Sequence, residues 1–357
     1  MTLQRWLRLA AAVGIVWLLV HLFTSSDTSL TLVGLPAAPG RVKDDALCRP
    51  QGWRPFRVAP DAPPRKVFDL VMVNTELDWL EVRLNTTWDN VDFFILVEGA
   101  KTFTGQPKSL LLKQNLASPQ LAPYKSKIIY HEIEYPPSFR PKSPWDYEDF
   151  QRNAMLTQVF PRLSGGTIEG AAPHAGDVIV VSDVDEIPRP STLSRLRACH
   201  FPRRLTLRSR FYYYSFQFLH DGPEWPHPQA TFYQGSRTVR PNDLRMGLGF
   251  FLSLWWDRAD MAGAAWHCSS CFRTVEEFLT KMASFSHTSM NAERFRDKKL
   301  IAEKVRKGLD LWERKGETFT RIDDNQDVPP FLLENSERFG YMLSRDGKSA
   351  GFVDYED

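Results

Sequence analysis

The chain has 357 residues, 43% of them hydrophobic and 25% charged, which is ordinary for a globular protein large enough to bury an extensive core. It carries 45 Lys and Arg against 43 Asp and Glu, so its formal net charge is only +2. A nucleic-acid-binding protein normally has a clear basic excess, and this balance argues against that function. Most of the 24 Phe, 11 Trp and 10 Tyr are expected to fill the core, although a sugar-stacking surface would also use them.

The amino terminus has the pattern of a membrane signal-anchor. Residues 1–8 contain Arg5 and Arg8, and residues 9–23 are apolar except for His21. The run is shorter than the roughly 20 residues that a spanning helix usually needs, and a cleaved signal peptide is the alternative. No A-x-A-like cleavage site follows closely, so we expect an uncleaved anchor. Basic residues before the apolar run place this end in the cytosol and the rest of the chain in the lumen.

Residues 24–65 are rich in Pro, Ala and Gly and show no helical or strand period, which predicts an extended stem. Asn85 begins an N-glycosylation sequon close to a predicted helix end.

Four cysteines, at positions 48, 199, 268 and 271, suit a large lumenal domain with one or two disulfides. The last two form a C-x-x-C pair with no second Cys or His pair at metal spacing. A short disulfide or two thiols is therefore favoured there over a zinc site.

From residue 66 to residue 357 we expect one folded domain. In chain order, the apolar patterns predict strands over residues 66–73, 91–98, 127–134 and 177–188, and helices over residues 76–84, 147–160 and 291–312. Alternating strands and helices predict an α/β fold with a Rossmann-type, mostly parallel sheet flanked by helices. Ligands of such sheets bind outside the carboxyl ends of the strands. Asn74, Glu76 and Glu98 are expected at those ends.

The strongest functional signal is the segment VIVVSDVDEIP, residues 178–188, in which Asp183, Asp185 and Glu186 follow a buried strand. If the strand stays extended, the side chains of Asp183 and Asp185 point to the same side. Two close carboxylates repel and raise each other's pKa unless a cation lies between them. Mn²⁺ or Mg²⁺ would suit these oxygen ligands and keep positions open for phosphate oxygens. The alternative is an acidic turn that caps a helix beginning near Pro190.

Four motifs resemble a known family: NTELDWLEVR at residues 74–83, VDFFILVEGAKTFTGQPKSL at 91–110, SDVDEIPR at 182–189 and AWHCSSCF at 265–272. The chain is similar there to the β-1,4-mannosyl-glycoprotein 4-β-N-acetylglucosaminyltransferase family, inverting transferases that add the bisecting GlcNAc to N-glycans. The similarity runs from about Phe68 to the last helix. Val184 replaces an Ala of the mammalian enzyme and Ala265 an expected Gly, so the resemblance supports the reaction type more than the acceptor.

The resemblance implies a GT-A fold behind the anchor and stem, and a type II single-pass protein of the Golgi membrane. It implies transfer from UDP-GlcNAc to a glycan hydroxyl with inversion and a Mn²⁺ or Mg²⁺ cofactor. A fixed cation would stabilise the charge that develops on the diphosphate leaving group. The partners are then the sugar nucleotide, a glycoprotein or glycan acceptor, and the membrane.

The candidate site residues fall into three groups. Asp183, Asp185 and His267 are assigned to the metal, with His267 either a ligand or a satisfied core histidine and His287 a weaker candidate. The nucleotide-sugar is assigned to Asn74, Glu76, Glu98, Arg152 and Asp183, where Arg152 offers a bidentate fork to phosphate or pairs with a carboxylate. Glu186 is assigned as the catalytic base, with Asp221, Glu224 and Asp243 as alternatives.

Two other classes of function stay open. A lectin would use aromatic segments such as FYYYSF at residues 211–216, but it does not need the acidic pair. A two-metal hydrolase would need more His and Asp ligands near that pair than the sequence has. Turnover of a sugar nucleotide separates the transferase from both.

Overall fold

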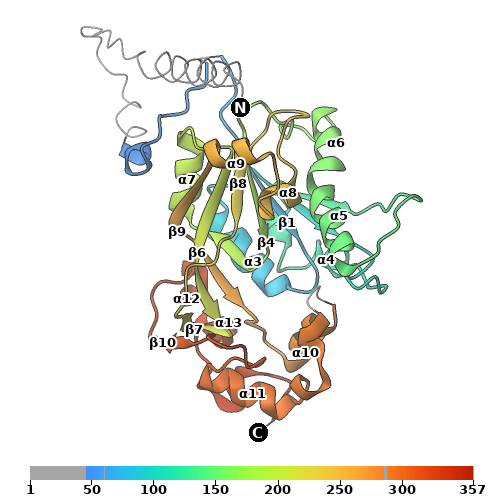
Figure 1. Cartoon of the computed structure of the whole chain (residues 1–357), viewed down its shortest axis with the longest axis vertical. Coiled ribbons are helices and arrows are strands. Elements are labelled where there is room, and N and C mark those ends of the chain that lie inside the picture. The colour runs from blue at the N-terminus through green and yellow to red at the C-terminus, as the bar shows by residue number, and fades with distance from the viewer. Residues whose placement is uncertain (1–45, 60, 285–287, 357) are drawn as a thin grey trace, which may run out of the picture. The chain divides into compact units, whose positions relative to one another are not determined.

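A mixed β-sheet forms the centre of the computed structural model, which describes residues 46–59, 61–284 and 288–356 (Figure 1). Its strands are β1 Val67–Met72, β2 Phe93–Glu98, β3 Ile128–Glu132, β4 Val178–Asp183, β5 Glu186–Pro188, β6 Arg204–Tyr213, β7 Ser215–His220, β8 Gln229–Phe232, β9 Arg258–Ser269 and β10 Phe319–Arg321. The order across the sheet is β10-β7-β6-β8-β4-β1-β2-β3, with β9 beside β6 and β5 beside β9.

The first half of the sheet confirms the predicted parallel arrangement. Strands β3, β2, β1 and β4 are parallel neighbours, and all of them lie within the segments expected from sequence. The second half differs, because β8 pairs antiparallel with both β4 and β6, and β7 pairs antiparallel with β6 and β10. Antiparallel strands can be joined by tight turns, and Tyr214 (φ 64°) makes such a turn between β6 and β7. The sheet is therefore mixed rather than mostly parallel.

Helices cover both faces of the parallel half, as predicted. Helix α3, Leu77–Thr87, packs Trp79 and Leu80 into a core that includes Val71 of β1. On the other face, α5 (Pro144–Thr157) and α6 (Phe160–Ser164) bury Ala154, Met155 and Leu163 against Phe68 and Ile95. The two cores arise because successive residues of a strand point to opposite faces. This layering brings the carboxyl ends of β1, β2 and β4 to one edge.

The remaining helices are α4 Leu111–Asn115, α7 Pro190–Ala198, α8 Pro241–Arg245, α9 Phe251–Trp256, α10 Val275–Ser284, α11 Lys298–Lys307, α12 Pro330–Glu334 and α13 Ser336–Leu343. Figure 1 shows α10 and α11 at the end of the domain that carries β7 and β10. Helix α11 is shorter than the 291–312 segment expected from sequence. Asp297 caps its first turn, and Gly308 ends it with φ 61°, where an added Cβ would lie 2.4 Å from Phe218.

The expected membrane anchor at residues 9–23 and most of the stem at residues 24–65 lie outside the described residues. Within the part of the chain that the structure describes, none of the helices has the length and apolar character needed to cross a bilayer. The described residues belong to one compact unit, residues 44–357.

Two disulfides account for all four cysteines. Cys268 and Cys271 are joined to each other, so the C-x-x-C pair is not a zinc site. Cys48 is joined to Cys199 at the end of α7, across a sequence separation of 151. The second bridge fastens the segment before β1 to the end of α7.

We expect the Cys48→Ser, Cys199→Ser double variant to lose about 2–4 kcal/mol in its free energy of unfolding, because a cross-link over a long loop restricts the unfolded chain. Urea unfolding monitored by circular dichroism measures the loss. An unchanged unfolding midpoint would contradict this bridge, and the reduced wild type serves as the control.

Candidate active site

The acidic segment forms a tight turn at the carboxyl end of β4. Strand β4 ends at Asp183, residues 184–185 make the turn, and β5 begins at Glu186. The condition for Asp183 and Asp185 to point the same way, an extended strand, is therefore not met. The helix-cap alternative is also wrong, since the cap residue of α7 is Arg189 and no side chain caps that end. The three acids must be explained by their own contacts.

A buried arginine from α3 holds the main chain of this turn. Arg83 forms a bidentate ion pair with Asp69 of β1 (2.7 and 2.6 Å), and both side chains are almost wholly buried. Its other nitrogen donates to the carbonyl oxygens of Asp183 and Glu186, at 3.2 and 2.7 Å. Arg83 also donates to the hydroxyl of Ser182. The motifs at residues 74–83 and 182–189 are thus linked by one guanidinium group.

Two further arginines neutralise Asp183 and Glu186. Arg245, at the end of α8, donates to Asp183 Oδ2 at 2.7 Å and to both carboxylate oxygens of Glu186, at 2.8 and 2.9 Å. Arg152 of α5 donates to Glu148 at 2.8 Å and to Asp183 Oδ1 at 3.4 Å. Arg152 is therefore paired with carboxylates here. Its predicted contact with phosphate stays a prediction.

Glu186 is buried completely, and both of its carboxylate oxygens are engaged. The indole of Trp225 donates to Oε1 at 2.7 Å, and the main-chain N–H of Asp183 donates to Oε2 at 3.0 Å. Burial raises the pKa of Glu186, but the guanidinium of Arg245 outweighs it and holds the pKa well below its usual range. This geometry favours a positioning role, and the predicted catalytic role of Glu186 stays a prediction.

Asp185 faces the opposite side of the turn, toward His267 of β9. Its carboxylate lies 3.8 Å from His267 Nδ1 and 3.9 Å from Lys281 Nζ, both too long for hydrogen bonds. Burial raises the pKa of Asp185, and the charges of His267 and Lys281 act in the opposite direction. Nδ1 of His267 is buried and has no hydrogen-bond partner among the described residues. Its ring contacts those of Trp225 (5.2 Å) and Phe211 (5.0 Å), which also contact each other (5.3 Å).

A carboxylate beside an unsatisfied imidazole nitrogen is a donor set that fits Mn²⁺. Asp185 and His267 therefore fit the predicted metal as a pair. Asp183, the third predicted ligand, forms ion pairs with Arg245 and Arg152, and its role as a metal ligand stays a prediction. Within the described ranges, no three His, Cys, Asp or Glu side chains are grouped as a metal centre. A cation bound here would need its other ligands from water or phosphate.

Polar residues also follow the ends of β1 and β2. Glu76 is the N-cap residue of α3, and its carboxylate accepts hydrogen bonds from the preceding main-chain N–H groups of Asn74 (3.2 Å) and Thr75 (2.9 Å). Glu98 accepts from the N–H groups of Leu112 and Lys113 at the start of α4, at 2.9 and 3.1 Å. The nucleotide-binding assignments of Asn74, Glu76 and Glu98 stay predictions.

Lys108 adds a positive charge between the two carboxylates. Its Nζ lies 3.8 Å from Glu98 Oε1 and is buried with no hydrogen-bond partner in the described part of the chain. Burial lowers the pKa of Lys108, while Glu98 and Glu76 act to raise it. An ammonium group has three donors, and within the described residues those of Lys108 are not satisfied.

We expect Glu98→Gln to lower the free energy of unfolding by about 1–3 kcal/mol, because the amide cannot accept both N–H groups of α4 and leaves one buried donor unsatisfied. Chemical denaturation measures this change, with Glu132→Gln as the control on the neighbouring strand, where the side chain is 40% exposed. Equal midpoints for the two variants would mean that Glu98 does not cap α4.

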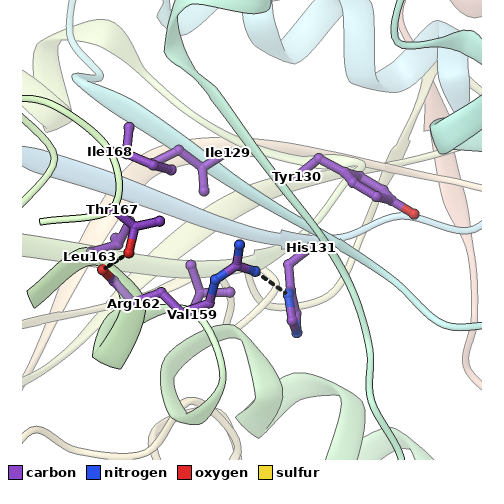
Figure 2. A pocket seen from close by; sticks show the side chains of 8 residues that line it. All are labelled: Ile129, Tyr130, His131, Val159, Arg162, Leu163, Thr167 and Ile168. Atoms are coloured by element: carbon purple, nitrogen blue, oxygen red, sulfur yellow. Dashed lines mark hydrogen bonds between the residues drawn. The ribbon is translucent and has the colours of Figure 1, made fainter. Parts of the chain in front are cut away.

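A small cavity between β3 and α6 is too small to be the substrate site. Figure 2 shows its lining, where Arg162 reaches toward His131. Arg162 donates to His131 Nδ1 at 3.2 Å, if that nitrogen is the acceptor. The volume of about 30 Å³ accommodates one water molecule.

The other candidates are placed as follows. Asp221 accepts from the Thr320 hydroxyl at 2.5 Å, and Glu224 accepts from the main-chain N–H of Gly263 at 3.1 Å. Asp243 lies in the first turn of α8. Asn85 is exposed on α3, as its predicted glycosylation requires. His287 lies outside the described residues.

Arg245, Trp225 and Lys108 contact or adjoin the predicted site residues, but no sequence pattern singled them out. Arg245 and Trp225 are about 40 to 60 positions from the acids and lie in no recognised motif. Lys108 lies inside the motif at residues 91–110, and this position in a motif was the one sequence feature that could have pointed to it.

Comparison with solved structures finds weak similarity to two sugar-nucleotide enzymes. One is a mannosyltransferase from Pyrobaculum calidifontis solved with GDP-Man and Mn²⁺: 12% identity, TM-score 0.32, covering 84% of this chain and 78% of that one. The other is glucosyl-3-phosphoglycerate synthase from Mycobacterium tuberculosis solved with Mn²⁺ and UDP-glucose: 12% identity, TM-score 0.31, covering 81% and 92%. TM-scores this low carry no weight in the assignment.

Sequence comparison is more informative. The chain is 25% identical over 319 residues to human β-1,4-mannosyl-glycoprotein 4-β-N-acetylglucosaminyltransferase, and 24% identical to the rat and mouse proteins of that name. Each alignment covers 80% of this chain but 56% of the relative, so the chain matches little more than half the length of these proteins.

The profile of glycosyltransferase family 17 matches residues 15–348. This match covers nearly the whole chain, including all four motifs described above, and the chain therefore belongs to glycosyltransferase family 17.

Proposed function

We propose that this protein transfers GlcNAc from UDP-GlcNAc to a mannose hydroxyl of an N-glycan, with inversion, in a metal-dependent reaction on a GT-A fold. One observation carries the proposal: in a family 17 chain, the turn after β4 presents Asp185 to the buried Nδ1 of His267, which has no hydrogen-bond partner within the described residues. The names of the relatives support the donor and the acceptor.

Different residues of the site are assigned to metal binding and to the positioning of the acidic turn. Asp185 and His267 would hold Mn²⁺ or Mg²⁺, which supplies a Lewis acid for the diphosphate leaving group. Arg83 fixes the main chain of the turn, and Arg245 with Arg152 fixes Asp183 at its edge. Rigid placement of charged groups is what electrostatic catalysis requires.

The nucleotide is assigned to the ends of β1 and β2, where Asn74, Glu76 and Glu98 lie near Lys108. The ammonium group of Lys108 supplies the positive charge that a diphosphate needs. A carboxylate must also take the proton of the acceptor hydroxyl. Glu186 was predicted for this step, although its oxygens are engaged by Arg245 and Trp225.

We also propose that residues 9–23 anchor the protein in the Golgi membrane as a type II single-pass protein, with the catalytic domain in the lumen. The support is the apolar run after Arg5 and Arg8. Carbonate extraction of membranes is expected to leave the full chain in the pellet. Recovery in the soluble fraction would favour a cleaved signal peptide.

The enzymatic test uses the full chain with Mn²⁺, UDP-GlcNAc and a mannose-terminated N-glycan core. We expect release of UDP and a new β-linked GlcNAc, identified by mass spectrometry and by NMR of the product. Omission of the metal and replacement of the donor by GDP-mannose or UDP-glucose are the controls. Binding of the glycan without turnover of any donor would instead indicate a lectin.

A further inference from the structure

A pocket of about 340 Å³ opens beside the acidic turn, between β6, β7 and the loop at residues 221–225. Its lining residues are Arg210, Phe211, Leu219, His220, Gly222, Pro223 and Glu224. None of the metal or nucleotide assignments above lies in it. The pocket is large enough for a sugar ring and open to solvent on one side.

The wall of this pocket is continuous with the candidate metal site. Phe211 stacks on His267 with ring centroids 5.0 Å apart and lies 5.3 Å from the ring of Trp225. Trp225 in turn donates to Glu186 at 2.7 Å. A ligand in the pocket would therefore lie one aromatic ring away from the pair Asp185 and His267.

The pocket combines an aromatic ring with two groups that bind hydroxyls. The C–H groups of a pyranose carry partial positive charge and pack well on the negative face of a ring such as Phe211. Both carboxylate oxygens of Glu224 accept from the one N–H of Gly263, at 3.1 Å each, and a carboxylate can accept about four hydrogen bonds. Arg210 is held by Asp327 at 3.0 Å and has further N–H donors.

We propose that this pocket binds the acceptor sugar, with its ring on Phe211 and a hydroxyl hydrogen-bonded to Glu224. The inference rests on the proposed transferase function and adds to it the place of the acceptor. The position suits that role because donor and acceptor must meet at the metal-binding turn from different sides. Arg210 and Glu224 select a ligand that is rich in hydroxyl groups.

Gly222 offers a way to close the pocket without touching the metal site. A Cβ at this position would lie 2.3 Å from Cε1 of His220, so any side chain must displace that ring, which itself lines the pocket. Gly347 is a matched control, because an added Cβ there meets no atom within 4 Å. Glu303, which is 54% exposed on α11, provides the control for the exchange at Glu224.

The experiment compares the Gly222→Val and Glu224→Gln variants with Gly347→Val and Glu303→Gln in the full chain. Two quantities are measured for each: hydrolysis of UDP-GlcNAc with Mn²⁺ in the absence of acceptor, and the KM of transfer to a mannose-terminated N-glycan core. We expect both pocket variants to raise this KM at least tenfold, and Gly222→Val to keep donor hydrolysis within about twofold of the wild type. The two control variants should resemble the wild type in both measurements.

The outcomes separate the two proposals. An unchanged acceptor KM in both pocket variants overturns the pocket assignment and leaves the transferase function standing. Loss of donor hydrolysis in both variants, with their melting temperatures unchanged, also overturns the pocket assignment. That result would mean that the pocket binds the sugar nucleotide. A wild type that turns over no sugar nucleotide refutes the transferase function. Saturation-transfer NMR with the same glycan then tests the pocket directly, and equal signals from wild type and Gly222→Val would refute it.

Discussion

Asp185→Asn is expected to lower sugar transfer by about 100-fold or more, since even the outer partners of metal ligands are worth about 10–100-fold. The folded domain should be as stable as the wild type or slightly more stable. The Asp185 carboxylate is largely buried, and its nearest cationic groups, on His267 and Lys281, are 3.8 and 3.9 Å away. A carboxylate desolvated without a hydrogen-bonded partner is unfavourable, and the amide removes that cost.

Melting curves with and without Mn²⁺ and UDP complete this test. The ligands should raise the melting temperature of the wild type, because a ligand that binds only the native state stabilises it. The increase should vanish in Asp185→Asn. An active Asp185→Asn enzyme that keeps the increase would end the metal assignment.

Asp183→Asn should behave differently, although the sequence alone suggested the same outcome for both acids. Asp183 accepts from Arg245 at 2.7 Å and from Arg152 at 3.4 Å, so its loss weakens two charge-assisted hydrogen bonds. We expect a loss of about 1–3 kcal/mol in the free energy of unfolding together with a loss of transfer. Urea denaturation of the two variants side by side measures the difference. Equal stability of both would mean that the arginines do not hold Asp183.

Arg83→Met is expected to cost about 3–5 kcal/mol in the free energy of unfolding, the usual effect of removing one partner of a buried ion pair. Asp69 would be left as an unpaired, buried carboxylate, and the carbonyl oxygens of Asp183 and Glu186 would lose their donor. Arg83→Lys should recover only part of the loss. The lysine restores the positive charge beside Asp69, but its ammonium group cannot reproduce the bidentate geometry.

Arg321→Met is the matched control. Its guanidinium also forms ion pairs with carboxylates, those of Asp323 and Asp346, but the side chain is 44% exposed. Exposed pairs contribute about 0–1 kcal/mol, so this variant should unfold near the wild-type midpoint. A similar loss in both arginine variants would show that burial is not what makes Arg83 important.

The local elements of the parallel half could be predicted from sequence, because hydrophobic periodicity is a local property. Strands β1 to β4 and helices α3 and α5 lie where their apolar patterns indicated. The position of the acids at a strand end also followed, since the apolar run of β4 stops at Asp183. The four motifs, above all those at residues 182–189 and 265–272, indicated the family, which the profile match confirms.

Tertiary structure alone decided how the charges are paired. The sequence placed Asp183 and Asp185 two residues apart, but the turn sends one to Arg245 and the other to His267. Arg245 reaches the acids only because the antiparallel strand β8 lies next to β4 and carries α8 to that edge. Such pairing depends on which distant segments become neighbours, and no local pattern encodes it. The sequence therefore identified the acids and His267 as candidates, while the fold brought Arg83, Arg245 and Trp225 to them and determined which charge each acid meets.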